Sequence, residues 1–394
     1  MKIGIDARWI FRETSGIGVY TRELIRHLAE IDRQNQYVLF FRDAVLKEAM
    51  QGEIASFPAG NFSAFLLNFG LFSIKNQLSM PAIINELHLD VFHSTNYMIP
   101  LRAFPRNRSG KTACVINIHD LIPLIFSKAT PHALKTRFSP LYRWLMKEVT
   151  MRSNLIITGS KSSLNDIVNF LYCRPERILT IPDGVSVGFH PAKADILPSQ
   201  DPRLSRRKKI ILWVGRRDPY KNLTGLTEAF SMLRKNYRGP LELRLVGPAD
   251  SRYPEASQRV VALGLADAVT WVGHISESEL VAEYQNANVF VLPSYYEGFG
   301  LPILEAFACG TPVICSNKSS LPEICGKAAL MVDPKDITGI CDAMHRVLTD
   351  ARLAGDLAER GLKQAAGFNW RETAKKTILA YEQALMIKNR TCPP

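Results

Sequence analysis

The sequence YYEGFGLPILEAFACG contains two glutamates, Glu297 and Glu305, with a short glycine-containing run between them. Two carboxylates on either side of such a run could bind a ligand. The hydrophobic run VFVLPS comes before them and predicts a strand, and Pro302 suits the first position of a following helix. Glu297 is therefore expected in the loop, and Glu305 in the first turn of the helix. There Glu305 would accept two hydrogen bonds from a vicinal diol such as ribose, and Glu297 would hold a sugar hydroxyl.

The residues between the two glutamates predict a phosphate site. Backbone amides that lead into the N-terminus of a helix face the positive end of its dipole, and glycines let a ligand approach the backbone closely. The residues expected to bind in this way are Gly298, Phe299, Gly300 and Leu301. The alternative is that Glu305 only complements the helix N-terminus and that Glu297 is solvated. The local pattern favours neither interpretation over the other.

Three cations between a predicted strand and a predicted helix favour the ligand-binding interpretation of the two glutamates. Arg216, Arg217 and Lys221 follow the run IILWVG, and Asn222 is a plausible N-cap of the helix NLTGLTEAFSMLRK. Arginine offers a planar fork and lysine a point charge, so the cluster would clamp a diphosphate. A solvated basic turn is the commoner interpretation of such a cluster taken alone.

The N-terminal half offers two further features. The run SGIGVYTREL contains Gly16 and Gly18, but Thr21 stands where G-x-G-x-x-G needs its last glycine, so a dinucleotide site is weakly supported and a simple turn is the alternative. His119 is followed by Asp120 at the end of the predicted strand CVINIH. A lone histidine is usually structural, yet this pair at a strand's carboxyl end favours function.

Alternating strand-like and helix-like segments predict a parallel α/β fold in two halves. The first series of predicted strands begins at Lys2, Gln36, Val91, Cys114, Leu155 and Ile178. The second begins at Ile210, Leu241, Val269, Val289, Thr311 and Leu330. We expect an N-terminal domain over 1–190, a linker over 191–209, a C-terminal domain over 210–368, and a helix over 369–394 that crosses back to the first domain.

Composition narrows the function classes. The chain has 394 residues and a net charge of +12, which is compatible with nucleic acid, an anionic membrane or a phosphorylated substrate, and does not choose among them. Charges in the first eight residues argue against a signal peptide, and the best apolar run, from Phe62 to Ile74, is too short to span a bilayer. Seven cysteines without a C-x-x-C pair argue against a disulfide framework and a zinc site. A cytoplasmic protein is expected.

These motifs together resemble the retaining glycosyltransferases of family 4, which have the GT-B fold. The spacing of Glu297 and Glu305 is similar to the family's E-x7-E element, and Gly215 to Asn222 to its G-R-x(4)-K-N element; the resemblance covers nearly the whole chain. It implies two Rossmann-like domains facing across a cleft, the first for the acceptor and the second for a nucleotide sugar. Ser319 and Ser320 stand where the family often has glycines.

The resemblance also implies roles for single residues. Gly16 and Gly18 would lie near the donor phosphates and the acceptor, and His119 would contact the donor sugar near the reacting carbon. His119, Glu297, Arg216 and Lys221 would form the catalytic set. Loops around Gly273 and His274 would select the base. No metal site and no cofactor are expected.

The resemblance is strongest to bacterial enzymes of cell-surface polysaccharide synthesis, many of which are mannosyltransferases that use GDP-mannose. The expected acceptor is a saccharide or a lipid-linked oligosaccharide. There are three alternatives: a UDP-sugar donor, a sugar-nucleotide epimerase of the same fold, and a binding protein whose active site has become inactive. The basic and apolar segment from His132 to Arg152 would allow weak contact with an anionic membrane, although packing into the domain is the favoured interpretation. Nucleic-acid binding rests on charge alone and is not expected. The sequence makes no prediction of oligomeric state.

Overall fold

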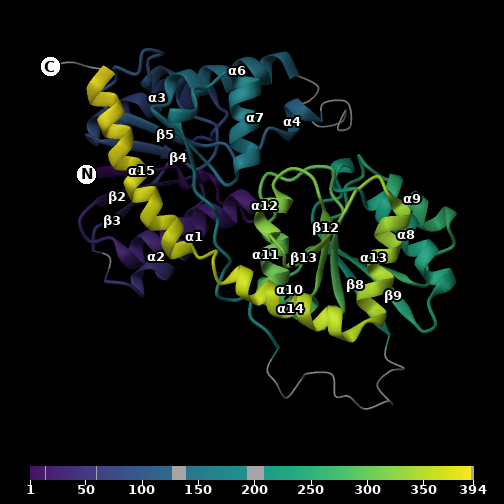
Figure 1. Ribbon diagram of the computed structural model, residues 1–394. Helices are drawn as coiled ribbons and strands as arrows, with labels where there is room; N and C mark the ends of the chain where they lie inside the picture. The colour runs from purple at the N-terminus through teal and green to yellow at the C-terminus, as the bar shows by residue number, and fades with distance from the viewer. Residues whose placement is uncertain (14, 59, 127–138, 193–207, 392–394) are drawn as a thin grey trace. The chain divides into compact units, whose positions relative to one another are not determined.

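A computed structural model describes residues 1–13, 15–58, 60–126, 139–192 and 208–391 (Figure 1). The chain folds into two compact units. Unit 1 comprises Met1–Leu121, Phe138–Gly184 and Trp370–Pro394, and unit 2 comprises Ile122–Arg137 and Val185–Asn369. Most of the predicted linker, and the start of the segment from His132 to Arg152, lie outside the described residues. No helix in the described ranges is long and apolar enough to cross a membrane.

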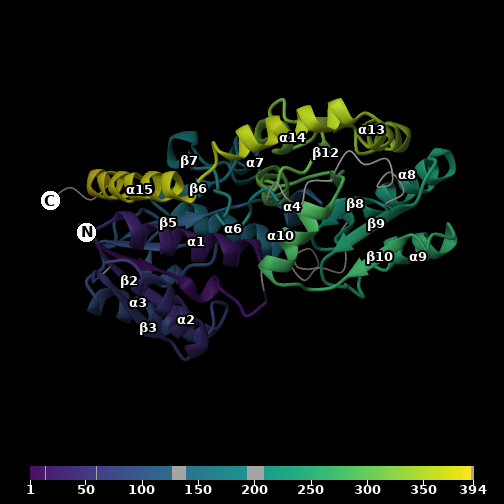
Figure 2. The ribbon, with the colours of Figure 1, turned by 90° about the horizontal axis from the view of Figure 1, so that it is seen from below.

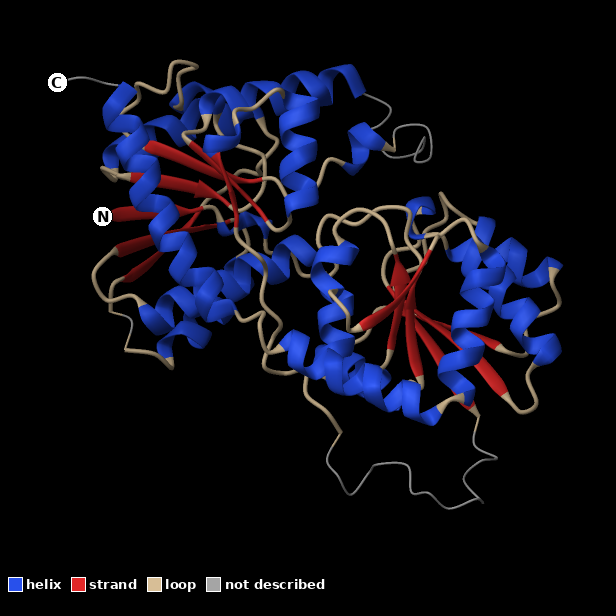
Figure 3. Ribbon diagram, in the orientation of Figure 1, coloured by secondary structure: helices blue, strands red, loops and turns tan. Residues whose placement is uncertain are grey.

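Unit 1 is built on a parallel sheet with the strand order β3-β2-β1-β4-β5-β6-β7. The strands are β1 (Lys2–Ile5), β2 (Gln36–Phe41), β3 (Phe62–Leu66), β4 (Val91–Ser94), β5 (Ala113–Asn117), β6 (Leu155–Thr158) and β7 (Ile178–Thr180). The six predicted strands are confirmed, and their Val- and Ile-rich runs are buried because helices cover both faces (Figure 3). Strand β3 was missed. It lies at the sheet edge, where Phe65 and Leu66 stay exposed, so no buried run marks it.

The helices of unit 1 surround this sheet. They are η1 (Ala7–Trp9), α1 (Gly16–Ile31), α2 (Ala44–Ala55), α3 (Ile74–Glu86), η2 (Leu101–Ala103), α6 (Ser139–Arg152), α7 (Lys161–Leu171), η3 (Pro175–Arg177) and α15 (Trp370–Thr391). The C-terminal helix α15 lies along α1 (Figure 2). Its Tyr381 hydroxyl and Nδ1 of His93, in β4, are hydrogen-bonded at 2.8 Å in the core. The predicted return of the C-terminal helix to the first domain is confirmed.

Unit 2 has a second parallel sheet, with the order β10-β9-β8-β11-β12-β13. The strands are β8 (Lys209–Val214), β9 (Leu241–Val246), β10 (Val269–Val272), β11 (Val289–Leu292), β12 (Val313–Ser316) and β13 (Ala329–Val332). Its helices are α4 (Ile122–Ile125), η6 (Pro219–Lys221), α8 (Leu223–Asn236), α9 (Glu255–Ala262), α10 (Glu277–Asn286), α11 (Leu301–Ala308), α12 (Leu321–Cys325), α13 (Ile337–Thr349) and α14 (Ala351–Ala365). All six predicted strands are confirmed.

Parallel strands place all their carboxyl ends at one edge of each sheet, and ligands of such folds bind outside that edge. In unit 2, Glu297 follows β11 and Lys221 follows β8, which is the neighbouring strand. The ends of β8 and β9 also approach each other closely, because a Cβ on Gly247 would meet the carbonyl oxygen of Gly215 at 1.9 Å. In unit 1, His119 follows β5. The fold therefore gives each unit its own set of candidate residues.

Candidate active site

The loop between β11 and α11 carries the first glutamate. Gly300 is the N-cap of α11 at φ +113°, and a Cβ there would lie 2.9 Å from Leu321 Cδ2, so only glycine fits. The helix begins at Leu301, which places Glu305 beyond its first turn. The predicted first-turn position of Glu305 was wrong, and complementing the helix N-terminus cannot be its main role.

Glu297 and Lys221 form a buried ion pair. Lys221 Nζ donates to Oε1 and Oε2 of Glu297 at 2.7 and 2.8 Å, and the Ser294 hydroxyl donates to Oε1 at 2.6 Å. The two side chains of the pair are only 11% and 8% exposed. The interpretation of Glu297 as a solvated residue was therefore wrong. Because Lys Nζ has three N–H donors, the pair leaves one of them for a phosphate oxygen.

The two arginines beside Lys221 behave differently from it. Arg216 pairs with Asp218 at 3.3 Å, and its side chain is 65% exposed. Arg217 lies over the ring of Trp271 at 4.3 Å and donates to the Gly247 carbonyl at 3.2 Å. The predicted cluster is thus one buried lysine, one stacked arginine and one exposed arginine.

Asn222 is confirmed as the N-cap of α8. Its Oδ1 accepts a hydrogen bond from Gly225 N at 3.3 Å. Its Nδ2 donates to the carbonyls of Pro293, at 3.1 Å, and Pro334, at 2.7 Å. Asn222 therefore ties the lysine loop to the strand end that precedes Glu297.

Two serines hold the Glu297 loop from the side of α12. The Ser319 hydroxyl accepts a hydrogen bond from Glu297 N at 2.8 Å. The Ser320 hydroxyl lies 2.9 Å from the carbonyls of Glu297 and of Phe299, both of which can accept its proton. Glycine at these positions would lack both hydroxyls, so this chain fixes its Glu297 loop by contacts that side chains provide.

We expect Ser320→Ala to loosen this loop. It leaves two carbonyls without their hydroxyl partner, which should lower the free energy of unfolding by about 1–3 kcal/mol. Nucleotide affinity should fall several-fold, as calorimetry would measure. Ser319→Gly is the matched control. It also removes a hydroxyl and one hydrogen bond, but Ser319 has φ +53°, so glycine relieves backbone strain at this position and the two effects on stability oppose each other. Equal stability of wild type and Ser320→Ala would contradict this role.

The second glutamate of the spacing, Glu305, is partly buried beside Tyr284 of α10. The Tyr284 hydroxyl donates to Glu305 Oε2 at 2.8 Å. Burial raises the pKa of the Glu305 carboxyl to about 7, although the tyrosine hydrogen bond acts in the opposite direction. The carboxyl thus gains or loses its proton near neutral pH, and a diol that donated to it would favour the ionised form.

The structure does not bring Gly273 and His274 beside the Lys221–Glu297 pair. Both are exposed after β10, which lies two strands from β8 and three from β11, separations of about 10 and 14 Å. Their predicted role in base selection stays a prediction.

In unit 1, His119 is joined to the start of α1 through Thr95. His119 Nε2 donates to the Thr95 carbonyl at 3.0 Å, and the Thr95 and Thr21 hydroxyls lie 2.7 Å apart. The His119 ring packs edge-on against Tyr20, with centroids 4.9 Å apart. Burial lowers the pKa of His119, so the imidazole is neutral at pH 7 and its Nδ1 is an acceptor.

Gly16 and Gly18 lie in the first turn of α1, so the alternative of a simple turn was wrong. Ser15 is the N-cap, and its hydroxyl accepts from Gly18 N at 3.1 Å. A Cβ on Gly18 would lie 3.1 Å from that hydroxyl, whereas one on Gly16 would meet open space. The small residues therefore start a helix whose N-terminus lies on the His119 side of the sheet.

Asp183 was not singled out by the sequence. It is 5% exposed, and its Oδ1 is buried without a hydrogen-bond partner among the described residues. Burial raises its carboxyl pKa to about 7. Burial, and after it the Asp183 charge, raises the pKa of Tyr20, the residue that packs on His119. Its position after β7, in the run IPDGV, was the available signal.

Comparisons with known proteins agree with the two-unit architecture. The model "Glycosyltransferase Family 4" matches residues 14–189, and the model "Glycosyl transferases group 1" matches residues 199–364. The chain is 29% identical over 403 aligned residues to O-antigen chain mannosyltransferase B of Escherichia coli, covering 97% of this chain and 100% of that protein.

Solved structures share the fold. Sucrose-phosphate synthase from Thermosynechococcus elongatus superposes with a TM-score of 0.74 at 23% identity, over 97% of this chain and 98% of that one. Anabaena HepE in complex with UDP-glucose superposes with a TM-score of 0.73 at 16% identity, over 97% of this chain and 99% of that one.

Proposed function

Since the chain belongs to the family 4 glycosyltransferases with the GT-B fold, we propose that it transfers mannose from GDP-mannose, with retention of anomeric configuration, to a saccharide or lipid-linked acceptor in cell-surface polysaccharide synthesis. The observation that carries the proposal is the buried Lys221–Glu297 pair beside the N-terminus of α11. A cation, a carboxylate and backbone amides thus lie at the ends of two neighbouring strands, which is what a sugar diphosphate requires.

Unit 2 would hold the donor through groups already described. The free N–H of Lys221 and the amides around Phe299 and Gly300 would face the diphosphate. Glu297 would accept from a sugar hydroxyl, and Glu305 from the ribose diol. In unit 1, Nδ1 of His119 would accept from a hydroxyl of the donor sugar.

The proposed reaction breaks the bond between the anomeric carbon and the diphosphate oxygen, and that oxygen keeps the electron pair. On the same face of the oxocarbenium-like centre, the acceptor oxygen forms the new bond, and its proton passes to the departing diphosphate. Lys221 and the helix start would stabilise the negative charge as it grows on the leaving group. The neutral imidazole of His119 would orient the sugar without taking up the proton.

We propose that the chain's own cations supply this charge, without a divalent ion. Turnover should then stay within about twofold of its original rate in excess chelator, because Lys221, in place of a metal ion, stabilises the negative charge on the leaving diphosphate. The measurement is the initial rate of transfer before and after chelation. Loss of activity that magnesium or manganese restores would contradict the proposal.

A calorimetric comparison of GDP, UDP and ADP tests the donor. The mannosyl assignment predicts that GDP binds most tightly, since mannosyltransfer in this family commonly uses GDP-mannose. Transfer of radiolabelled mannose to an oligosaccharide, without formation of a sugar isomer from donor alone, would separate a transferase from an epimerase. A clear preference for UDP would rule out mannose from GDP-mannose and leave the reaction class intact.

We further propose that α6 rests on an anionic membrane surface. Tyr142, Met146 and Val149 anchor the helix in unit 1, so part of the predicted stripe packs inside as the favoured interpretation held. The opposite side leaves large apolar side chains in solvent, with Leu141 61% and Trp144 50% exposed. Cations accompany them: Arg143 is exposed on the same helix, and Lys147 lies over the ring of exposed Tyr172. Apolar rings flanked by cations suit an anionic interface.

Vesicles of phosphatidylglycerol and phosphatidylcholine should retain the protein at low salt, and pure phosphatidylcholine vesicles should retain much less. The double variant Leu141→Ser, Trp144→Ser should reduce the bound fraction several-fold in a sedimentation assay. Val261→Ser, which changes an exposed apolar residue of α9 in unit 2, is the control and should bind as the wild type. Failure of the anionic vesicles to retain the wild type would refute the proposal.

A further inference from the structure

A cavity lies in unit 1, at the same sheet edge as His119. It has a volume of about 650 Å³, within the range of small-molecule sites. Its lining comes from three segments, each of which follows a strand: η1 and the residues after it follow β1, Arg42 and Asp43 follow β2, and Gly70 to Ser73 follow β3. These strands are neighbours in the sheet, so the cavity lies outside three adjacent carboxyl ends, where α/β proteins bind ligands.

Two exposed aromatic rings border this cavity. Phe11 is 48% exposed and Phe72 is 61% exposed. Both rings pack edge-on against Trp9, with centroids 6.3 and 5.9 Å apart. Trp9 is itself buried, and its Nε1 donates to the Ser94 hydroxyl at 3.3 Å. A fixed ring therefore holds two phenyl rings in solvent, which is costly unless a ligand covers them.

Polar groups of both kinds lie beside the rings. Arg12 donates to Asp43 at 2.7 Å, and both residues line the cavity. The guanidinium of Arg42 lies over Gly70, where a Cβ would come within 3.1 Å of it. The third lining arginine, Arg8, is already paired with buried Asp6 at 2.7 Å. The carboxylate offsets part of the positive charge, so the lining offers donors and an acceptor together, as vicinal hydroxyls require, and does not form a simple anion site.

We infer that this cavity binds a sugar ring of the acceptor other than the ring that reacts. The inference rests on the proposed glycosyl transfer. Phe11 and Phe72 would cover the apolar faces of the ring, and Arg12, Asp43 and Arg42 would bond its hydroxyls. The strand β1 is two strands from β5, about 10 Å, so the cavity is displaced from His119 along the sheet edge. The acceptor class is therefore an oligosaccharide, and its length is recognised beyond the reacting sugar.

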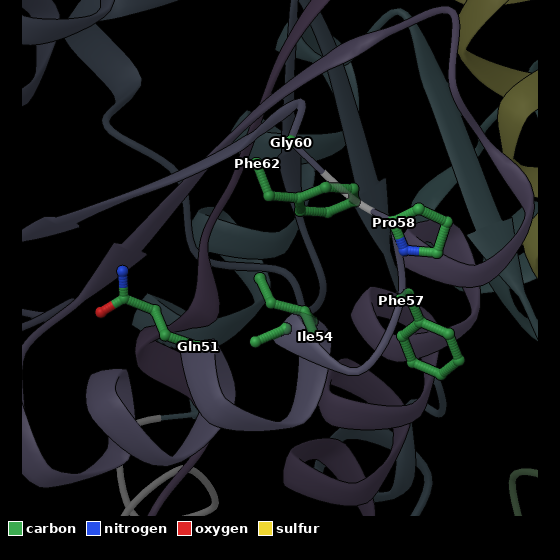
Figure 4. A pocket seen from close by; sticks show the side chains of 7 residues that line it. Gln51, Ile54, Phe57, Pro58, Gly60 and Phe62 are labelled. Carbon is green, nitrogen blue, oxygen red and sulfur yellow. The ribbon is translucent and has the colours of Figure 1, made fainter.

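Another cavity of unit 1 provides a comparison (Figure 4). It measures about 410 Å³ and is lined at the end of α2 and the start of β3, by residues that include Gln51, Phe57 and Phe62. It therefore lies at the amino end of β3, opposite the edge that carries His119. Among the described residues that line it, Gln51 bears the only polar side chain, so this cavity offers few groups to a sugar.

Calorimetric titration of the full chain with trisaccharides of mannose, glucose, galactose and N-acetylglucosamine tests the inference. At least one should bind the wild type, and methyl α-mannoside should bind it at least tenfold more weakly than mannotriose if mannotriose is the ligand. Phe11→Ala with Phe72→Ala should weaken trisaccharide binding about tenfold or more, since each ring contributes a stacking contact. Arg42→Gln should weaken it less. Gln51→Ala should bind as the wild type.

Nucleotide binding separates this inference from the proposed function. All four variant residues are outside unit 2, so GDP affinity should be unchanged in each. If the wild type bound a trisaccharide but no nucleotide, the proposed transfer would fail and the cavity would stand. If no trisaccharide bound, or if the double phenylalanine variant bound one as tightly as the wild type, the cavity assignment would be overturned while the transferase proposal remained.

Discussion

Replacing Lys221 with methionine is expected to abolish detectable transfer and to lower the free energy of unfolding by about 3 kcal/mol. The chemistry fails because the cation that would face the leaving diphosphate is gone. The stability cost arises because Glu297 is nearly buried and is left without its partner, and breaking such a pair costs about 3–5 kcal/mol. Transfer assays and urea denaturation followed by tryptophan fluorescence measure the two effects.

The double variant Lys221→Met, Glu297→Gln tests the reason. The amide removes the unpaired charge and can still accept from Ser294, so it should recover part of the lost stability without recovering transfer. Arg216→Ala is the matched control, because that side chain is mostly exposed and its pair with Asp218 contributes little. It should reduce turnover with a change in stability within about 0.5 kcal/mol. Wild-type transfer in Lys221→Met would rule out the proposed role.

From the sequence, substitution of Lys221 is expected to weaken binding and turnover without unfolding the chain, and the structure adds the stability cost. The loop after a strand and the N-cap Asn222 were recognisable because they depend on residues close together in the chain. The partner of Lys221 is 76 positions away, and no local pattern reveals that contact. Strand-end reasoning placed both residues at one sheet edge, but the sheet order that makes β8 and β11 neighbours had to come from the fold.

Ser319 and Ser320 illustrate the same limit. The resembled family often has glycines at these two positions, so the sequence alone assigns no role to the serine side chains. Their hydroxyls hold the Glu297 loop 22 and 23 positions earlier in the chain. Similarly, a glycine-containing run alone could not distinguish a turn from the capped first turn of α1, because the deciding hydrogen bond is donated by the Gly18 amide to the Ser15 hydroxyl.

Nucleotide-sugar affinity is expected to rise about tenfold between pH 6 and pH 8. Burial raises the pKa of the Glu305 carboxyl from 4.5 to about 7, so this group is mostly protonated at pH 6 and mostly ionised at pH 8. A ribose diol that donates two hydrogen bonds favours the ionised form, and binding should therefore release a proton. Calorimetry in buffers of different ionisation enthalpy measures this release. The esterified phosphates of a nucleotide sugar do not titrate in the window.

Protein stability should follow the opposite trend. The folded chain holds the Glu305 proton to a higher pH than the unfolded chain, so this group's contribution to stability falls as pH rises from 4.5 through 7 and is constant above that. Ligand binding, which selects the ionised carboxyl, should offset this loss, and urea denaturation with and without the nucleotide sugar compares the two trends.

Two variants decide whether Glu305 is responsible. Glu305→Gln cannot ionise, so the affinity trend should disappear, with affinity low at every pH, and the stability trend should lose the part that Glu305 contributes and keep the part that Asp183 contributes. Tyr284→Phe removes the hydroxyl that donates to the carboxylate and lowers its pKa, so the midpoint of the affinity change should move above pH 7. If Glu305→Gln kept the wild-type pH dependence, another group would carry it and Glu305 would not bind the ribose. If Tyr284→Phe moved the midpoint downward, the hydrogen bond would not stabilise the ionised carboxyl as the geometry requires.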